Sequence, residues 1–217
     1  MQVEIYSDVV CPWCYIGERR FAKALQSFPG RDDVHVVFRP YQLDPDAPST
    51  ATPLPDALAT KFGANARAMM ARVADAAAGE GITINWDDAL SVNTLTAHRL
   101  LRLAEREYSV EVQRALAERL FDAHFTRGGN VADPGQLATL AVASGMELDR
   151  VQQYLGSAEG LAETREELER AGAMGIRAVP SFVFEGQYLV EGGQEPETFL
   201  AVLNEVASRG AKEHASA

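Results

Sequence analysis

Two cysteines are separated by two residues in the stretch Val10-Cys11-Pro12-Trp13-Cys14, and the chain has no other cysteines. A pair at this spacing can cycle between dithiol and disulfide, bind a metal as half of a site, or pack as inert thiols. A bridge over two residues closes almost no loop and therefore adds little stability. The spacing favours redox chemistry over a structural role.

A metal site is the first alternative. Zinc sites of this kind need a second pair of ligands, and the four histidines of the chain do not show the required spacing of three to five residues. We therefore predict no metal at the cysteine pair.

A helix that starts at the pair would divide the work between the two thiols. Pro12 would stand at the first helical position, where its missing N–H costs nothing. The free N–H groups and the positive end of the helix dipole would favour the thiolate of Cys11. Cys14, three residues on, would share the same face and be more buried. We predict that Cys11 attacks a disulfide and that Cys14 resolves the mixed disulfide.

The surrounding pattern supplies such a helix. Residues 3–7 are expected to form a strand, and residues 34–38 a second, buried strand. Between them, apolar residues at spacings of 7, 4 and 3 predict a helix from Cys14 to Phe28, which Pro29-Gly30 ends. A Cys-x-x-Cys pair inside a β-α-β unit is typical of a redox motif.

The rest of the chain is mostly helical in pattern. We expect a proline-rich loop over 43–55, a hairpin over 181–190, and helices over 64–78, 94–108, 112–123, 134–144, 158–174 and 198–207. The predicted fold class is α/β, in which strands from both ends form one sheet around a large helical insertion. As domains, we predict a sheet-containing unit of residues 1–44 and 160–217 and an inserted helical unit of residues 45–159.

Charge and hydropathy exclude several partners. The net charge of −11 over 217 residues repels nucleic acid and anionic membranes. No apolar run approaches the ~20 residues of a membrane helix, and no signal peptide follows Met1. We expect a cytoplasmic protein.

A second stretch, Gly-Ile-Arg-Ala-Val-Pro-Ser-Phe at 175–182, completes a recognisable pattern. Together with the cysteine pair and the helical insertion, it resembles the thioredoxin superfamily and its DsbA-like branch, in particular the cytosolic FrnE-like subgroup of predicted dithiol–disulfide isomerases. Stretches around Asn93, His98 and Gln194 are similar to the same subgroup. The resemblance implies a thioredoxin-like fold and a cis bond between Val179 and Pro180 beside the cysteines. Taken alone, the Val-Pro bond has only about a 5–6% chance of being cis.

The resemblance also implies roles for the neighbours of the pair. Pro12, Trp13, Val179 and Pro180 would bind an extended segment of substrate through an apolar lip and the Val179 backbone. The expected partners are protein or peptide thiols and disulfides, with a small thiol or a reductase for recycling, and no bound cofactor is expected.

Two other functions stay open at this point. One is a glutathione-type isomerase or transferase of the kappa or hydroxychromene-carboxylate isomerase kind, in which Cys14 would have no use. The other is a non-catalytic peptide-binding module. Asp8 and Glu18 flank the pair, and either could accept the proton of Cys14 if it were buried; we expect both to be solvated. We expect His98 and His124 to be structural.

Overall fold

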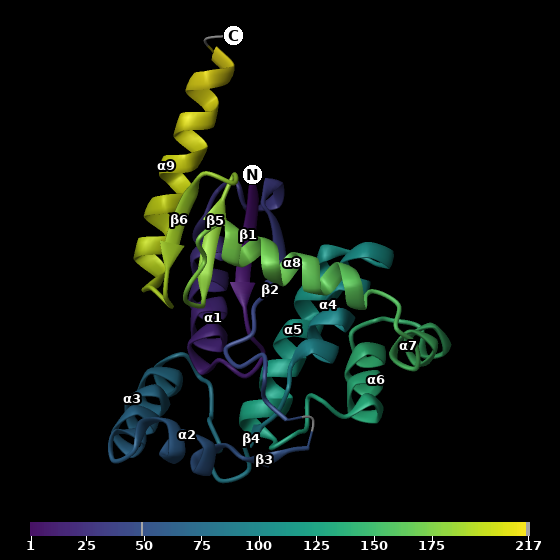
Figure 1. Ribbon diagram of the computed structural model, residues 1–217. Helices are drawn as coiled ribbons and strands as arrows, with labels where there is room; N and C mark the ends of the chain where they lie inside the picture. Colours follow the sequence, from purple (N-terminus) through teal and green to yellow (C-terminus); the bar gives the residue numbers. More distant parts are fainter. Residues whose placement is uncertain (49, 216–217) are drawn as a thin grey trace.

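A computed structural model describes the backbone of residues 1–48 and 50–215, and the side chains of 1–48 and 50–210. Its main sheet combines strands from the two ends of the chain (Figure 1). The spatial order is β2-β1-β5-β6, in which β1 pairs parallel with β2 and antiparallel with β5, and β5 pairs antiparallel with β6. The strands are β1 (Gln2–Ser7), β2 (His35–Pro40), β5 (Ser181–Phe184) and β6 (Tyr188–Glu191).

Helices cover both faces of this sheet. On one face, α1 (Pro12–Ser27) and α9 (Pro196–Ala215) pack against β5 through aromatic rings that lie 4.5–6.2 Å apart: Phe21, Phe182, Phe184 and Phe199. On the other face, α8 (Leu161–Ala173) covers Tyr6 and Val183 through Ala171 (Figure 1). Alternation of side chains along each strand produces these two cores.

The segment between β2 and α8 is largely helical. It contains α2 (Leu54–Phe62), α3 (Asn65–Gly79), α4 (Leu95–Glu107), α5 (Val110–Phe121), α6 (Pro134–Ala143) and α7 (Leu148–Leu155). A 3₁₀ turn, η1 (Arg31–Asp33), precedes β2, and a π-helical turn, η2 (Asp122–Thr126), follows α5. The predicted outline of strands at both ends and helices between is confirmed, and the division into two domains at 44/45 and 159/160 stays a prediction.

The proline-rich segment is a loop as predicted over residues 43–48 and 50–51, and its end differs from the prediction. There Thr52–Pro53 form β3, which pairs with β4 (Leu90–Ser91), and α2 then begins at Leu54. Proline is tolerated in the first turn of a helix, so Pro55 starts α2 rather than preventing it. The short α7 was not predicted, and α9 continues eight residues beyond the expected end at 207.

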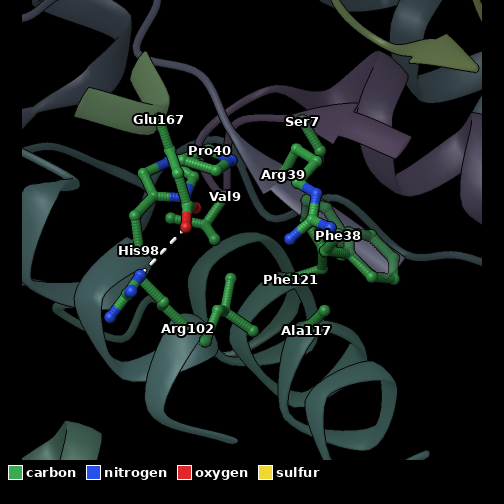
Figure 2. A pocket seen from close by; sticks show the side chains of 11 residues that line it. Ser7, Val9, Phe38, Arg39, Pro40, His98, Arg102, Ala117, Phe121 and Glu167 are labelled. Carbon is green, nitrogen blue, oxygen red and sulfur yellow. Dashed lines mark hydrogen bonds and ion pairs between the residues drawn. The ribbon is translucent and has the colours of Figure 1, made fainter. Parts of the chain in front are cut away.

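One buried side chain attaches α5 to the sheet. The Gln113 amide accepts a hydrogen bond from the Phe38 N–H at 2.9 Å and donates one to the Phe38 carbonyl at 3.0 Å. These two bonds satisfy backbone groups of β2, which is an edge strand and has no neighbouring strand on that side. The Gln113 contact holds α5 against β2. Ala117 and Phe121 of α5 therefore line the same small cavity as Ser7, the last residue of β1 (Figure 2).

Candidate redox site

The cysteine pair lies where β1 gives way to α1. Cys11 is the N-cap residue in extended conformation, and Pro12 occupies the first turn, as predicted. The Cys11 carbonyl accepts hydrogen bonds from the N–H groups of Cys14 at 3.0 Å and Tyr15 at 3.3 Å, which close the first turn. Both cysteines are free thiols, on the same turn of the helix.

The loop before β5 supplies the second part of the site. The Val179–Pro180 bond is cis, as the resemblance implied. The Cys11 thiol donates a weak hydrogen bond to the Val179 carbonyl at 3.8 Å. The two motifs, 168 residues apart in sequence, therefore meet at Cys11.

The two thiols differ in their surroundings, although both are buried. Cys14 is the more buried, at 1% exposure against 4% for Cys11. Burial raises the pKa of Cys14 well above its usual value, and the hydrogen bond and charge of Cys11 raise it further. A hydrogen bond from Ser7 and one from the Asp8 backbone act in the opposite direction on this pKa. Cys14 thus holds its proton firmly in the dithiol state.

The surface next to Cys11 is apolar. Trp13 is 40% exposed, one of the larger hydrophobic side chains left open to solvent. Pro12 and Val179 are half-buried, and Pro180 is buried. Leu43, in the loop after β2, is also exposed. The structure places all four residues expected to bind substrate around the cysteine pair.

Asp8 is buried, which corrects the expectation that it is solvated. Its carboxylate accepts a hydrogen bond from the Leu43 N–H at 2.8 Å and lies 3.3 Å from Nε2 of His98. These two partners replace water, so the carboxylate can be buried. His98, which we interpreted as structural, therefore contacts Asp8, whose backbone carbonyl accepts a hydrogen bond from the Cys11 N–H. The two partners are 90 positions apart, and the sequence carries no signal for their contact.

Glu18 is buried as well, again against expectation. Its carboxylate accepts hydrogen bonds from Nε and Nη2 of Arg114 at 3.2 and 3.1 Å. Burial raises the pKa of Glu18, and the Arg114 charge opposes that shift. The ion pair joins α1 to α5 one turn beyond Cys14.

The stretches around Asn93 and Gln194, which also resemble the FrnE-like subgroup, lie against the site. The Asn93 side chain donates to the carbonyls of Pro45 at 2.9 Å and Ala47 at 3.1 Å, which holds the loop that carries Leu43. Gly193 lies against Gly17 of α1, where a Cβ on Gly193 would lie only 3.2 Å from Cα of Gly17. Both contacts position backbone near the cysteines.

Within the residues that the structure describes, no group of three or more His, Cys, Asp or Glu side chains is placed to hold a metal ion. The two thiols of the pair therefore have no further ligand set beside them in this part of the chain.

Comparison with known proteins defines the class. The DSBA-like thioredoxin domain family matches residues 2–204, nearly the whole chain. The chain belongs to this family, and its fold is the thioredoxin-like α/β fold with a helical insertion.

Particular relatives extend over the same length. The crystal structure of a probable DsbA oxidoreductase from Streptomyces coelicolor is 34% identical, covers 96% of this chain and 90% of its own, and superposes with a TM-score of 0.88. A putative protein disulfide isomerase from Nitrosomonas europaea shares the fold at 19% identity, with 96% and 98% of the chains covered and a TM-score of 0.73. The uncharacterised protein YwbO of Bacillus subtilis is 24% identical over 212 residues, which is 94% of this chain and 96% of its own.

Among the helices of the described residues, none combines the length and the apolar character needed to cross a bilayer.

Proposed function

We propose that the protein is a thiol–disulfide oxidoreductase or isomerase that acts on protein or peptide disulfides. The observation that carries this proposal is the placement of Cys11 at the start of α1, beside the Val179 carbonyl, with Cys14 buried one turn further on. The family and the Streptomyces coelicolor relative support the same class of chemistry.

In the first step, the Cys11 thiolate attacks one sulfur of a substrate disulfide. A bond forms between Cys11 and that sulfur, the substrate S–S bond breaks, and the second substrate sulfur leaves with the electron pair and takes a proton. An extended substrate segment would lie on the lip formed by Trp13 and Val179, with its backbone paired to Val179.

In the second step, Cys14 loses its proton and attacks Cys11. The Cys11–Cys14 disulfide forms, the bond from Cys11 to the substrate breaks, and the remaining substrate sulfur leaves as a thiolate that is protonated. The substrate disulfide gains two electrons and the enzyme dithiol loses two. The reverse sequence oxidises a substrate, so the direction follows the potential of the compartment.

Several finer assignments belong to this proposal. We place the protein in the FrnE-like subgroup and in the cytoplasm, with Cys11 as nucleophile and Cys14 as resolving thiol. Recycling would use a small thiol or a reductase, and the site would need no bound cofactor.

The redox potential is the first test. Trp13 brings no positive charge to the Cys11 thiolate, so the reduced form is stabilised less than it would be beside a cation. We expect a reversible two-electron transition between about −120 mV, the value for DsbA, and about −270 mV, the value for thioredoxin. Titration in graded thiol/disulfide buffers, with free thiols counted by mass spectrometry, measures it. A pair that stays reduced across this range would contradict the proposal.

Trapping separates the alternatives. Cys14→Ser should accumulate a mixed disulfide between Cys11 and a peptide substrate, and Cys11→Ser should form none. A thiol-dependent isomerase would instead keep full turnover in Cys14→Ser. A non-catalytic binding module would show no redox turnover, and its affinity for peptides would survive the loss of both cysteines.

A further inference from the structure

The loop before β5 presents Val179 to Cys11, and a side-chain hydrogen bond ties its first residue to the sheet. This loop spans residues 174–180, between α8 and β5. The hydroxyl of Tyr6, in β1, donates to Sδ of Met174 at 3.3 Å. Near the other end of the loop, the Val179 carbonyl accepts the weak hydrogen bond from the Cys11 thiol. A residue of β1 therefore holds the beginning of the segment that ends at the redox pair.

Tyr6 holds the loop in a second way, through its ring. The ring is buried in a small apolar cluster with Ile176, in the middle of the loop, and Val183 of β5. Among the described residues, Met174 is the one hydrogen-bond partner of the Tyr6 hydroxyl. Buried tyrosine hydroxyls usually have a partner, and a thioether sulfur is only a weak acceptor. The start of the loop is therefore held by a hydrogen bond that depends on the chemical state of the Met174 sulfur.

Met174 is also the methionine most open to oxidants. All five methionines of the chain lie within the described residues, and Met174 alone is exposed, at 48%. Met146 is 3% exposed, and the other three are half-buried. Oxidation converts a thioether to a sulfoxide, which is polar and which methionine sulfoxide reductases convert back. The side chain that ties the loop to β1 is thus the methionine side chain most accessible to such chemistry.

We propose that Met174 is a site of reversible oxidation by hydroperoxides, and that its sulfoxide slows the reaction of Cys11 with substrate disulfides. The proposal concerns regulation of the redox site and rests on the proposed function. The Met174 sulfur attacks the terminal peroxide oxygen, an S–O bond forms and the O–O bond breaks. The sulfur is oxidised by two electrons, and the hydroperoxide proton moves to the leaving oxygen, which departs as water or an alcohol. In the reverse reaction a dithiol supplies two electrons and two protons, becomes a disulfide, and the sulfoxide oxygen leaves as water.

The sulfoxide acts through the hydrogen bond to Tyr6. A sulfoxide accepts hydrogen bonds at its oxygen, so the Tyr6 hydroxyl must either donate to an atom further from the sulfur or lose its partner. The start of the loop then moves away from β1, and Val179 is less often in position to pair with a substrate segment. Loss of a hydrogen bond of about 1 kcal/mol corresponds to about fivefold in an equilibrium constant. We therefore expect the mixed disulfide to form up to about fivefold more slowly.

Peroxide treatment of the disulfide form isolates this effect. The Cys11–Cys14 disulfide is formed first, because it protects both thiols from oxidation by the peroxide. The protein is then treated with hydrogen peroxide, freed of it, and reduced with dithiothreitol to restore the thiols. Rapid mixing with a disulfide-bonded model peptide, an acid quench and mass spectrometry give the rate at which the mixed disulfide forms.

The expected result has three parts. Peptide mapping should locate an added oxygen atom at Met174. The mixed disulfide with Cys11 should form up to about fivefold more slowly than in untreated protein. Incubation with a methionine sulfoxide reductase should remove the oxygen and restore the rate.

Three variants separate the Met174 sulfoxide from other oxidative damage. Tyr6→Phe removes the donor, so it should form the mixed disulfide slowly from the start, and oxidation of its Met174 should change the rate no further. Met174→Leu should show no response to peroxide. Met70→Leu removes a half-buried methionine of α3, is the matched control, and should respond to peroxide as the wild type does.

The contrary outcomes are distinct. A Met174 that stays unmodified under conditions that oxidise a short methionine peptide would overturn the proposal, and so would an unchanged rate with the sulfoxide in place. Slowing of Tyr6→Phe or Met174→Leu by peroxide to the same extent as the wild type would place the effect elsewhere and would also overturn it. If untreated wild-type protein forms no mixed disulfide at Cys11, the proposed function itself fails, a result that peroxide plays no part in.

Discussion

At the scale of single residues, the buried ion pair of Glu18 and Arg114 shows how charge is accommodated next to the redox pair. The Glu18 side chain is 5% exposed and that of Arg114 is 33% exposed. Because the folded-state pKa of Glu18 is raised, the folded protein binds this proton more tightly than the unfolded chain does. The contribution of Glu18 to stability therefore falls as pH rises through the interval between the two pKa values.

Arg114→Ala should destabilise the protein by about 1–3 kcal/mol near neutral pH, because it leaves a buried carboxylate without its cation and because the exposure of Arg114 moderates the loss. The loss should shrink as pH falls and Glu18 becomes protonated. Urea unfolding at neutral and mildly acid pH measures both effects.

Arg127→Ala is the matched control, since the exposed Arg127 pairs with Asp122 at 2.6 Å and should cost less than about 1 kcal/mol. Adding Glu18→Gln to Arg114→Ala should remove the pH dependence of the loss. A loss of the same size at both pH values would show that Arg114 acts through packing alone.

At the scale of elements, the contact between α1 and the cis-proline loop depends on two glycines. A Cβ on Gly17 would lie 3.0 Å from Cγ of Pro180 and 3.1 Å from Cα of Gly193. One neighbour is a rigid ring and the other is backbone, so neither can move without shifting its whole segment. The contact packs α1 against Pro180, the residue that follows Val179.

Gly17→Ala should therefore destabilise the fold by about 1–3 kcal/mol, the usual cost of overpacking. It should also slow formation of the mixed disulfide, because the Val179 backbone moves away from Cys11. Thermal unfolding and rapid-mixing kinetics measure the two effects. Gly172→Ala in α8 meets no atom within 4 Å and should be neutral or stabilising by up to about 1 kcal/mol. Similar behaviour of the two variants would contradict the argument.

The π-helical turn η2 carries a buried histidine that responds to acid. Burial lowers the pKa of His124 from 6.5 to about 4, against smaller opposing effects of the Asp8 charge and the Gly129 backbone. The unfolded chain binds this proton at higher pH, so the stability of the fold decreases as pH falls from about 6.5 to about 4. The accumulated loss is about 3 kcal/mol.

His124→Phe should remove this part of the acid sensitivity, because a phenyl ring can occupy the same place against Phe125, where the two rings now lie 4.6 Å apart. As pH falls, the free energy of unfolding of the variant should rise relative to that of the wild type. His35→Gln alters an exposed histidine and should leave the slope unchanged. Parallel pH profiles for wild type and His124→Phe would refute the assignment.

The elements that hold the cysteines were predictable because their signals are local. Apolar spacing, Pro12 at the helix start and Pro29-Gly30 at its end specify α1 within a few residues. The partners of the site were not predictable in the same way. Asp8 and His98 meet across 90 residues, and Ser7 shares its cavity with residues from α4, α5 and α8. The spacing of these residues in the sequence does not predict these contacts, because only the tertiary fold creates them.

At the scale of the whole molecule, the proposed function makes the net charge of −11 a factor in the choice of substrate. The lip formed by Trp13 and Val179 is uncharged, so under the proposed function contact alone does not select substrates by charge. The long-range field of the protein instead attracts basic peptides and repels acidic ones during diffusion.

Disulfide peptides with basic flanks should therefore form the mixed disulfide with Cys11 faster than peptides with acidic flanks, by about tenfold at low ionic strength. The difference should shrink toward high salt, because the screening length falls from about 10 Å at 0.1 M to about 3 Å at 1 M. Second-order rate constants across a salt series measure this, with a neutral peptide of the same core as the control. The decay of the mixed disulfide is intramolecular and should not depend on the flanks. A salt-independent preference would instead place charge recognition in direct contacts at the lip.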